Sequence, residues 1–201
     1  MHVTSTRPGL LSRRVALAGM VAAPIAGLVG CSGPGEGLPP VPGVDTSIYT
    51  LGPGDQIRII TFGEQQLTGE FRVDAAGEIA LPLVGGVHAG GLTPKQLEGS
   101  VAQALTRSKL YRNPSVSVEV IAYRPIFILG EVVRPGQYPY QPAMTVITAA
   151  AVAGGFTYRA VKDRFSIVRT SSKQAETIEG GAGRETFVQP GDVITVFERV
   201  F

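Results

Sequence analysis

The chain has 201 residues, of which 17% are charged and 44% hydrophobic, and its formal net charge is +2. Three arginines lie among the first 14 residues, whereas the first acidic residue is Glu36, so the part after residue 30 carries 15 basic against 16 acidic residues, a net charge of −1. That balance argues against a nucleic-acid-binding protein, which needs a basic patch on its folded domain.

An export signal is predicted at the N-terminus. Arg13 and Arg14 precede an uncharged run over 15–30, which matches the positive and apolar regions of a signal peptide. The run is shorter than the about 20 residues of a spanning helix, and Pro24 lies inside it. The residues around the two arginines also resemble an incomplete twin-arginine motif. Export through the Sec pathway and export through the twin-arginine pathway therefore both stay open.

The end of the apolar run predicts lipidation. Leu28-Val29-Gly30-Cys31 resembles a bacterial lipobox, and Cys31 is the one cysteine of the chain. We expect cleavage between Gly30 and Cys31 and acylation of the Cys31 sulfur, which leaves no thiol for a disulfide or a metal site. The alternatives are an ordinary signal peptide with a chance cysteine and an uncleaved anchor.

A segment rich in Gly and Pro, over 32–44, follows the cysteine. This composition disfavours helix and sheet and predicts a flexible tether from the lipid to the first domain. About 155 residues follow it, which is enough for two small domains or one of ordinary size.

The first part of the folded region is predicted to combine strands with one helix. Alternating or β-branched runs predict strands over 56–62, 70–74, 78–84 and 116–120. The strands over 70–74 and 78–84 are expected to form a hairpin, followed by a loop or a loosely paired short strand over 85–91. Thr93 and Pro94 supply a hydroxyl N-cap and a first-turn proline for a helix that ends near Lys109.

A second α+β unit follows Pro125. The strands expected in it cover 126–133, 138–140, 164–169 and 193–197. Thr145 is expected to cap a small helix that ends at Gly154 and Gly155. The polar stretch over 171–184 predicts a hairpin loop or a disordered tip. The turn at 190–192 repeats the Pro-Gly-Asp turn at 53–55, and we interpret the repeat as recurring local chemistry rather than duplication.

The residues offer little for catalysis. After cleavage the one histidine is His88, in a glycine-rich loop, and a single histidine without cysteines or clustered carboxylates is not a metal site. The sequence contains no nucleophile elbow and no phosphate-binding glycine motif. Glu70 and Glu78 are a carboxylate pair of the type used in glycoside hydrolysis, but strand carboxylates are usually solvated. We therefore expect a protein that is not an enzyme and that has no cofactor.

Several short motifs carry a family resemblance. The first four are LGPGDQIRI at 51–59, GEIALPLVG at 77–85, GLTPKQL at 91–97 and YRNPSVSV at 111–118. They resemble the export domain of the bacterial polysaccharide export protein family, the outer-membrane lipoproteins of capsule and exopolysaccharide secretion. FILGEVVRPGQY at 127–138, AGGFT at 153–157 and PGDVI at 190–194 are similar to its soluble-ligand-binding β-grasp (SLBB) domain. Together with the signal peptide expected over 1–30 and the tether expected over 31–46, the resemblance implies an export domain over 47–123 and a β-grasp domain over 124–201.

The resemblance also implies a function. The protein is expected to be a non-enzymatic, lipid-anchored subunit of a homo-oligomeric ring that passes a sugar polymer across the periplasm and the outer membrane. Its expected partners are the polysaccharide and an inner-membrane polysaccharide co-polymerase. The alternative is a monomeric lipid-anchored polysaccharide-binding or adaptor module, which size under native conditions separates because only the conduit requires a closed ring.

The expected location is the periplasmic side of the outer membrane, held in the lipid through acylated Cys31. Ser32 is not the aspartate that retains such lipoproteins at the inner membrane. After Cys31 no uncharged apolar run approaches about 20 residues, and the longest, over 143–156, fits a core helix better. A separate outer-membrane β-barrel protein is therefore expected to supply the pore.

Side chains suited to polysaccharide contact gather in the second unit. Tyrosine faces and arginine donors are the kinds of group that bind sugars. The candidates are Arg134, Tyr138, Tyr140, Tyr158 and Arg159. The competing interpretation gives Arg134 a role in a turn and places the tyrosines partly in the core.

Overall fold

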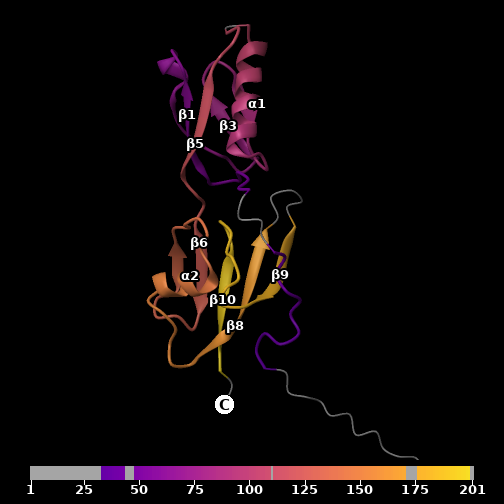
Figure 1. The fold of residues 1–201 in the computed structure, drawn as a ribbon, viewed down its shortest axis with the longest axis vertical. Coiled ribbons are helices and arrows are strands. Elements are labelled where there is room, and N and C mark those ends of the chain that lie inside the picture. Colours follow the sequence, from indigo (N-terminus) through magenta and orange to yellow (C-terminus); the bar gives the residue numbers. More distant parts are fainter. Residues whose placement is uncertain (1–32, 44–47, 110, 171–175, 200–201) are drawn as a thin grey trace, which may run out of the picture. The chain divides into compact units, whose positions relative to one another are not determined.

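The computed structural model describes residues 33–43, 48–109, 111–170 and 176–199. These residues form an α+β fold with two separate hydrophobic cores, one built from residues 51–118 and the other chiefly from residues 126–196 (Figure 1). Gly30 and Cys31 lie outside the described residues, so the predicted cleavage and lipidation stay predictions. Among the described residues, no helix combines the length and the apolar character that crossing a membrane requires.

The first core lies between small antiparallel sheets and one helix. The elements are β1 (Gln56–Thr61), η1 (Gln65–Leu67), β2 (Gly69–Arg72), β3 (Glu78–Leu81), β4 (Gly85–His88), α1 (Pro94–Arg107) and β5 (Val116–Ala122). The sheet order is β2-β1-β5, and β3 pairs with β4 alone. Ile57 and Ile59 of β1 are fully buried, because alternate residues of a strand face the same side.

Helix α1 begins where the sequence predicted. The Gln96 amide donates to Thr93 Oγ1 at 3.2 Å, and the Thr93 amide donates to Gln96 Oε1 at 2.9 Å, so the capping box is complete. Leu97, Val101 and Leu105 form the predicted apolar stripe and are fully buried.

The hairpin predicted over 70–84 is wrong in its pairing. Its turn is present, since Asp74 Oδ1 accepts the amides of Ala76 at 2.9 Å and Glu78 at 2.8 Å. However, β2 pairs with β1, and β3 pairs with β4, the short strand that the sequence left open as a loop. Periodicity identified the strands correctly but carries no information on which neighbour each one pairs with.

The second core lies between a five-stranded sheet and a short helix. The elements are β6 (Ile126–Gly130), β7 (Gly136–Tyr138), α2 (Val146–Val152), β8 (Ala160–Thr170), β9 (Thr177–Ala182) and β10 (Val193–Glu198), in the sheet order β7-β6-β10-β8-β9. Strands β6 and β10 are parallel, and the other pairs are antiparallel. Val146 and Ala149 of α2 join Ile128 and Ile167 in the core.

The polar stretch over 171–184 contains a strand that the sequence did not predict. Residues 177–182 form β9, which pairs with β8 in a continuous register from Phe165↔Ala182 to Thr170↔Thr177. Glycines at 180 and 181 disfavour a strand by propensity, but the close approach of the N-terminal segment requires a glycine at 180. A Cβ at Gly180 would lie 2.6 Å from the Val41 Cα.

The segment predicted as a flexible tether packs on the second domain. Its residues 33–43 run beside β9 (Figure 1), where Pro40 forms a parallel bridge with Gly181. The Val41 amide donates to the Gly181 carbonyl at 2.9 Å, and the Gly181 amide donates to the Pro39 carbonyl at 2.7 Å. Val41 is only 8% exposed and belongs to the second core. Composition predicted flexibility, whereas this sheet edge orders the segment.

Candidate functional site at the junction of the two domains

The site begins with the Pro-Gly-Asp turn that precedes β1. Gly54 adopts a φ of 96°, which the turn requires and which glycine adopts without strain. The turn folds back so that the Gly52 amide donates to Asp55 Oδ2 at 2.8 Å, and the Asp55 amide donates to the Gly52 carbonyl at 3.1 Å. The Asp55 side chain is completely buried, so its charge requires a partner.

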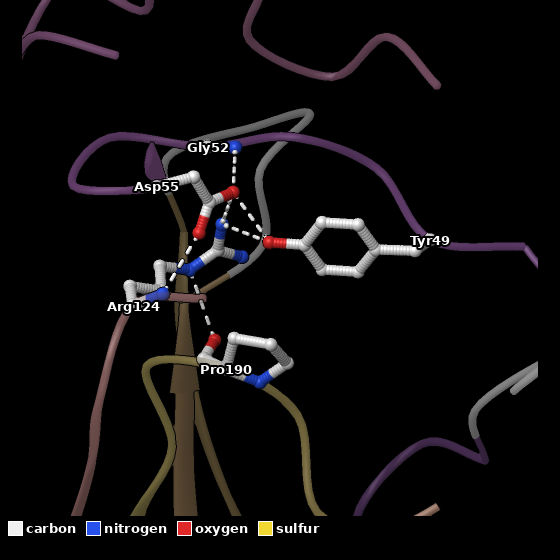
Figure 2. Close-up of polar contacts among 5 residues, drawn as sticks. All are labelled: Tyr49, Gly52, Asp55, Arg124 and Pro190. Atoms are coloured by element: carbon white, nitrogen blue, oxygen red, sulfur yellow. Dashed lines mark hydrogen bonds and ion pairs between the residues drawn. The ribbon is translucent and has the colours of Figure 1, made fainter. Parts of the chain in front are cut away.

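Arg124, two residues before β6, supplies that partner (Figure 2). Its main-chain amide donates to Asp55 Oδ1 at 2.9 Å, and its Nη1 donates to Asp55 Oδ2 at 3.1 Å. The Tyr49 hydroxyl also donates to Asp55 Oδ2. The carboxylate therefore accepts hydrogen bonds from two main-chain amides, one hydroxyl and one guanidinium.

The same arginine also contacts the second domain. Arg124 Nε donates to the carbonyl of Pro190 at 3.0 Å, within the second Pro-Gly-Asp turn (Figure 2). The guanidinium fits because Gly52 has no side chain, since a Cβ there would lie 2.2 Å from Arg124 Nη1. Arg124 thus joins the two Pro-Gly-Asp turns, one from each domain.

Aromatic rings extend this junction. Tyr49 and Tyr123 meet edge to face with ring centroids 4.8 Å apart, and Tyr123 meets Tyr140 in the same way at 5.4 Å. Burial and the hydrogen bond to Asp55 raise the pKa of Tyr49 far above its usual 10, so Tyr49 stays a donor at physiological pH. Burial also raises the pKa of Tyr140.

The second Pro-Gly-Asp turn holds its aspartate in the same way but pairs it within the domain. The Gln189 amide donates to Asp192 Oδ2 at 2.7 Å, while Arg169 donates to both carboxylate oxygens at 2.9 and 2.7 Å. Arg169 also donates to the carbonyls of Pro42 at 2.9 Å and Phe187 at 3.1 Å. Burial raises the pKa of Asp192, and the Arg169 guanidinium opposes that effect.

The structure brings together only part of the predicted sugar-contact set. The Tyr138 hydroxyl donates to the Arg134 carbonyl at 2.5 Å, so these two residues form one local turn. Tyr140 belongs to the aromatic row at the junction. Tyr158 is 84% exposed, and Arg159 forms a salt bridge with Glu198. Their contact with polymer stays a prediction.

The polar groups of the junction are satisfied by one another. Among the described residues, every buried polar side-chain atom has a hydrogen-bond partner, and no group of three or more potential metal ligands is present. The buried Asp55 and the half-buried Arg124 neutralise each other, and their geometry can hold two turns in a fixed relation.

The sequence does not predict the pairings of this junction. The repeated Pro-Gly-Asp predicts two turns but indicates no partner for either aspartate. The partner of Asp55 lies 69 residues further along the chain, and the partner of Asp192 lies 23 residues before it. The sequence feature that could indicate these ion pairs is the aspartate that ends each turn. An aspartate at the start of a buried strand requires a cationic partner.

Two family models match the chain, one in each domain. The model of the polysaccharide biosynthesis/export protein family matches residues 44–121, and the SLBB domain model matches residues 125–181.

Three curated relatives are similar to the chain. The exopolysaccharide production protein ExoF of Rhizobium meliloti (strain 1021) is 33% identical over 118 residues, covering 53% of this chain and 28% of the relative. The EPS I polysaccharide export outer membrane protein EpsA of Ralstonia nicotianae (strain ATCC BAA-1114 / GMI1000) is 26% identical over 163 residues, or 77% of this chain and 42% of the relative. The polysialic acid transport protein KpsD of Escherichia coli is 30% identical over 110 residues, or 53% of this chain and 19% of the relative.

The chain spans less than half the length of each of these relatives. Both family matches, in the same order as the two cores, agree with the export and β-grasp motifs found in the sequence. The chain belongs to the bacterial polysaccharide export protein family and has an export domain followed by an SLBB domain.

Proposed function

We propose that the protein is a lipid-anchored, periplasmic subunit of a conduit that exports capsular polysaccharide or exopolysaccharide across the outer membrane. The observation that carries this proposal is the succession of an export-domain match and an SLBB match in one chain. The names of two relatives, which describe export or transport of polysaccharides, support it. In this role the protein guides polymer and performs no catalysis.

The junction supports a scaffolding role. Arg124 bonds to Asp55 of the first domain and to Pro190 of the second. A subunit that lines a ring needs its domains at a constant angle, because closed symmetry depends on a reproducible geometry in every copy. We assign this positioning role to Arg124 and Asp55, in a homo-oligomer that also contacts an inner-membrane co-polymerase and a separate outer-membrane pore protein.

The packed N-terminal segment bears on how the subunit is anchored. Arg164 donates to Glu36 at 2.5 Å, and the Gly33 amide donates to Glu36 at 2.8 Å. Cys31 precedes Gly33 by two residues, and consecutive Cα atoms are about 3.8 Å apart. A lipid on Cys31 would thus attach within about 8 Å of Gly33. We propose that the second domain is the one held next to the membrane, although the first domain comes earlier in the sequence.

Deletion of the gene tests the central proposal. We expect polymer to be lost from the medium and the cell surface and to accumulate inside the cells, while its synthesis continues. Unchanged secretion in the deletion strain would refute the export role.

Complementation with the Cys31→Ser variant tests the anchor, by palmitate labelling and membrane fractionation. Normal labelling of that variant would refute lipidation at Cys31.

Native mass of the purified complex distinguishes the conduit from the alternative module. A ring gives a defined multiple of the subunit mass, whereas an adaptor runs as a monomer. Crosslinking in intact cells should recover the co-polymerase and the pore protein with the ring. A monomeric protein that crosslinks to neither would favour the adaptor.

A further inference from the structure

An open groove of about 830 Å³ is lined by residues from the end of α1 and from the segment that leads into β5. Figure 1 shows these two elements side by side in the first domain. This volume falls in the range of sites that bind small ligands or short stretches of polymer. The groove belongs entirely to the first domain. It contains none of the junction residues and none of the predicted sugar-contact residues.

The groove is strongly cationic. Arg107, Lys109 and Arg112 line it, and no acidic residue does. Within the described part of the chain, none of these three side chains takes part in a salt bridge or a side-chain hydrogen bond. Arg107 lies in the last helical turn, where a cation offsets the helix dipole. That effect fades beyond the last turn, so it does not account for Lys109 or Arg112.

Lys109 occupies a backbone position that suits glycine better. Its φ is 60°, in the left-handed region just after the helix, and its amide donates to the Thr106 carbonyl at 3.0 Å. Helices commonly place glycine or asparagine at this position, because a side chain costs energy there. Lys109 therefore adds a third cation to the groove at a backbone position where the fold itself gains nothing from a lysine.

The remaining lining of the groove is suited to hydroxyl-rich ligands. Gln103, Asn113 and Ser115 are exposed and line it together with the cations. Their amides and hydroxyl both donate and accept hydrogen bonds. Tyr111, next to Arg112 in the sequence, holds this loop, because its hydroxyl donates to Glu64 at 3.2 Å.

We propose that this groove binds carboxylated sugars, and that the polymer carried by the protein is acidic. The proposal rests on the export role above and specifies its substrate class. Carboxylates along the polymer pair with the three cations, and sugar hydroxyls bond to Gln103, Asn113 and Ser115.

Binding to defined oligosaccharides tests the proposal. The full chain, purified in mild detergent, is titrated by calorimetry with oligogalacturonate, which carries one carboxylate per sugar, and with a neutral maltooligosaccharide of equal length. We expect binding of the acidic oligomer alone. Raising the salt from about 0.1 M to about 1 M should abolish it, because the screening length falls from about 10 Å to about 3 Å.

Two variants locate the binding site. Arg107→Gln, Lys109→Gln and Arg112→Gln combined should weaken binding at least tenfold. The matched control is a variant with the same charge change at three exposed cations outside the groove, namely Arg72→Gln, Lys162→Gln and Arg184→Gln, and it should bind as the wild type does.

Lys109→Gly separates binding from folding. It removes one groove cation and relieves the left-handed backbone, so we expect weaker binding with an equal or higher melting temperature. Weaker binding with a lower melting temperature, or unchanged binding, would contradict the role of Lys109.

Three outcomes would overturn the proposal: equal binding of neutral and acidic oligomers, equal loss in the groove and control variants, or binding only to phosphatidylglycerol vesicles or to an acidic protein. The export role is judged separately, by secretion in the deletion strain. Lost secretion together with no binding of oligogalacturonate would refute the acidic substrate and leave the export role standing.

Discussion

Replacing Arg124 by methionine removes the guanidinium that neutralises a fully buried carboxylate. Asp55 would keep the Gly52 amide, the Arg124 main-chain amide and the Tyr49 hydroxyl as donors. Removing one partner of a buried ion pair costs about 3–5 kcal/mol, and the three remaining donors place this case at about 3 kcal/mol. Because 1 kcal/mol shifts the melting temperature of a chain of this size by about 2–4 °C, we expect a decrease of about 6–12 °C.

Thermal unfolding followed by circular dichroism measures this decrease. The matched control is Arg58→Met, which removes a cation from the Arg58–Glu70 pair, where the side chains are 45% and 61% exposed. Exposed pairs contribute about 0–1 kcal/mol, so the control should melt within about 4 °C of the wild type. Asp55→Asn combined with Arg124→Met should cost less than the sum of the two single changes. Equal melting of the Arg124 and Arg58 variants would refute the reasoning.

Three further changes probe the same contacts. Gly52→Ala places a Cβ 2.2 Å from Arg124 Nη1, so it should lower the melting temperature, and much less so in the Arg124→Met background. Gly180→Val forces Val41 off the sheet edge and should speed protease cleavage over 33–43, while unchanged cleavage would mean that the segment does not depend on this contact. The pKa of Tyr49 is raised in the folded state, so its contribution to stability is complete below pH 10 and is lost as the pH rises further. Urea unfolding of Tyr49→Phe should accordingly lose less stability above pH 10 than the wild type, and parallel losses would contradict the assignment.

The sequence predicted those parts of the fold that depend on neighbouring residues. The capped start of α1, the helix over 146–152 and most strands follow from local periodicity and capping chemistry, which act within a few residues. The α+β class follows from the order of these elements. Local information also identified both Pro-Gly-Asp turns, because each depends on a proline and a glycine in sequence.

Long-range contacts account for what the sequence could not predict. Strand β9 forms with two glycines because β8 and the segment over 33–43 cover them on both sides. That segment is ordered by the same contact, although its composition is typical of a linker. Arg124 belongs to no motif, and its role depends on two turns that lie 66 and 69 residues away in the sequence.

The second Pro-Gly-Asp turn connects the junction between the domains with the N-terminal segment over 33–43. Pro190 accepts a hydrogen bond from Arg124, which is paired with the first domain. Asp192, two residues later, holds Arg169, whose Nη1 donates to the carbonyl of Pro42 in the N-terminal segment. Thus one turn of the second domain is bonded to the first domain through one arginine and to the N-terminal segment through another. In a subunit anchored through Cys31, as proposed, a force on the lipid would reach the second domain first, because Glu36 contacts Arg164 and Val41 contacts Gly181 before the chain enters the first domain.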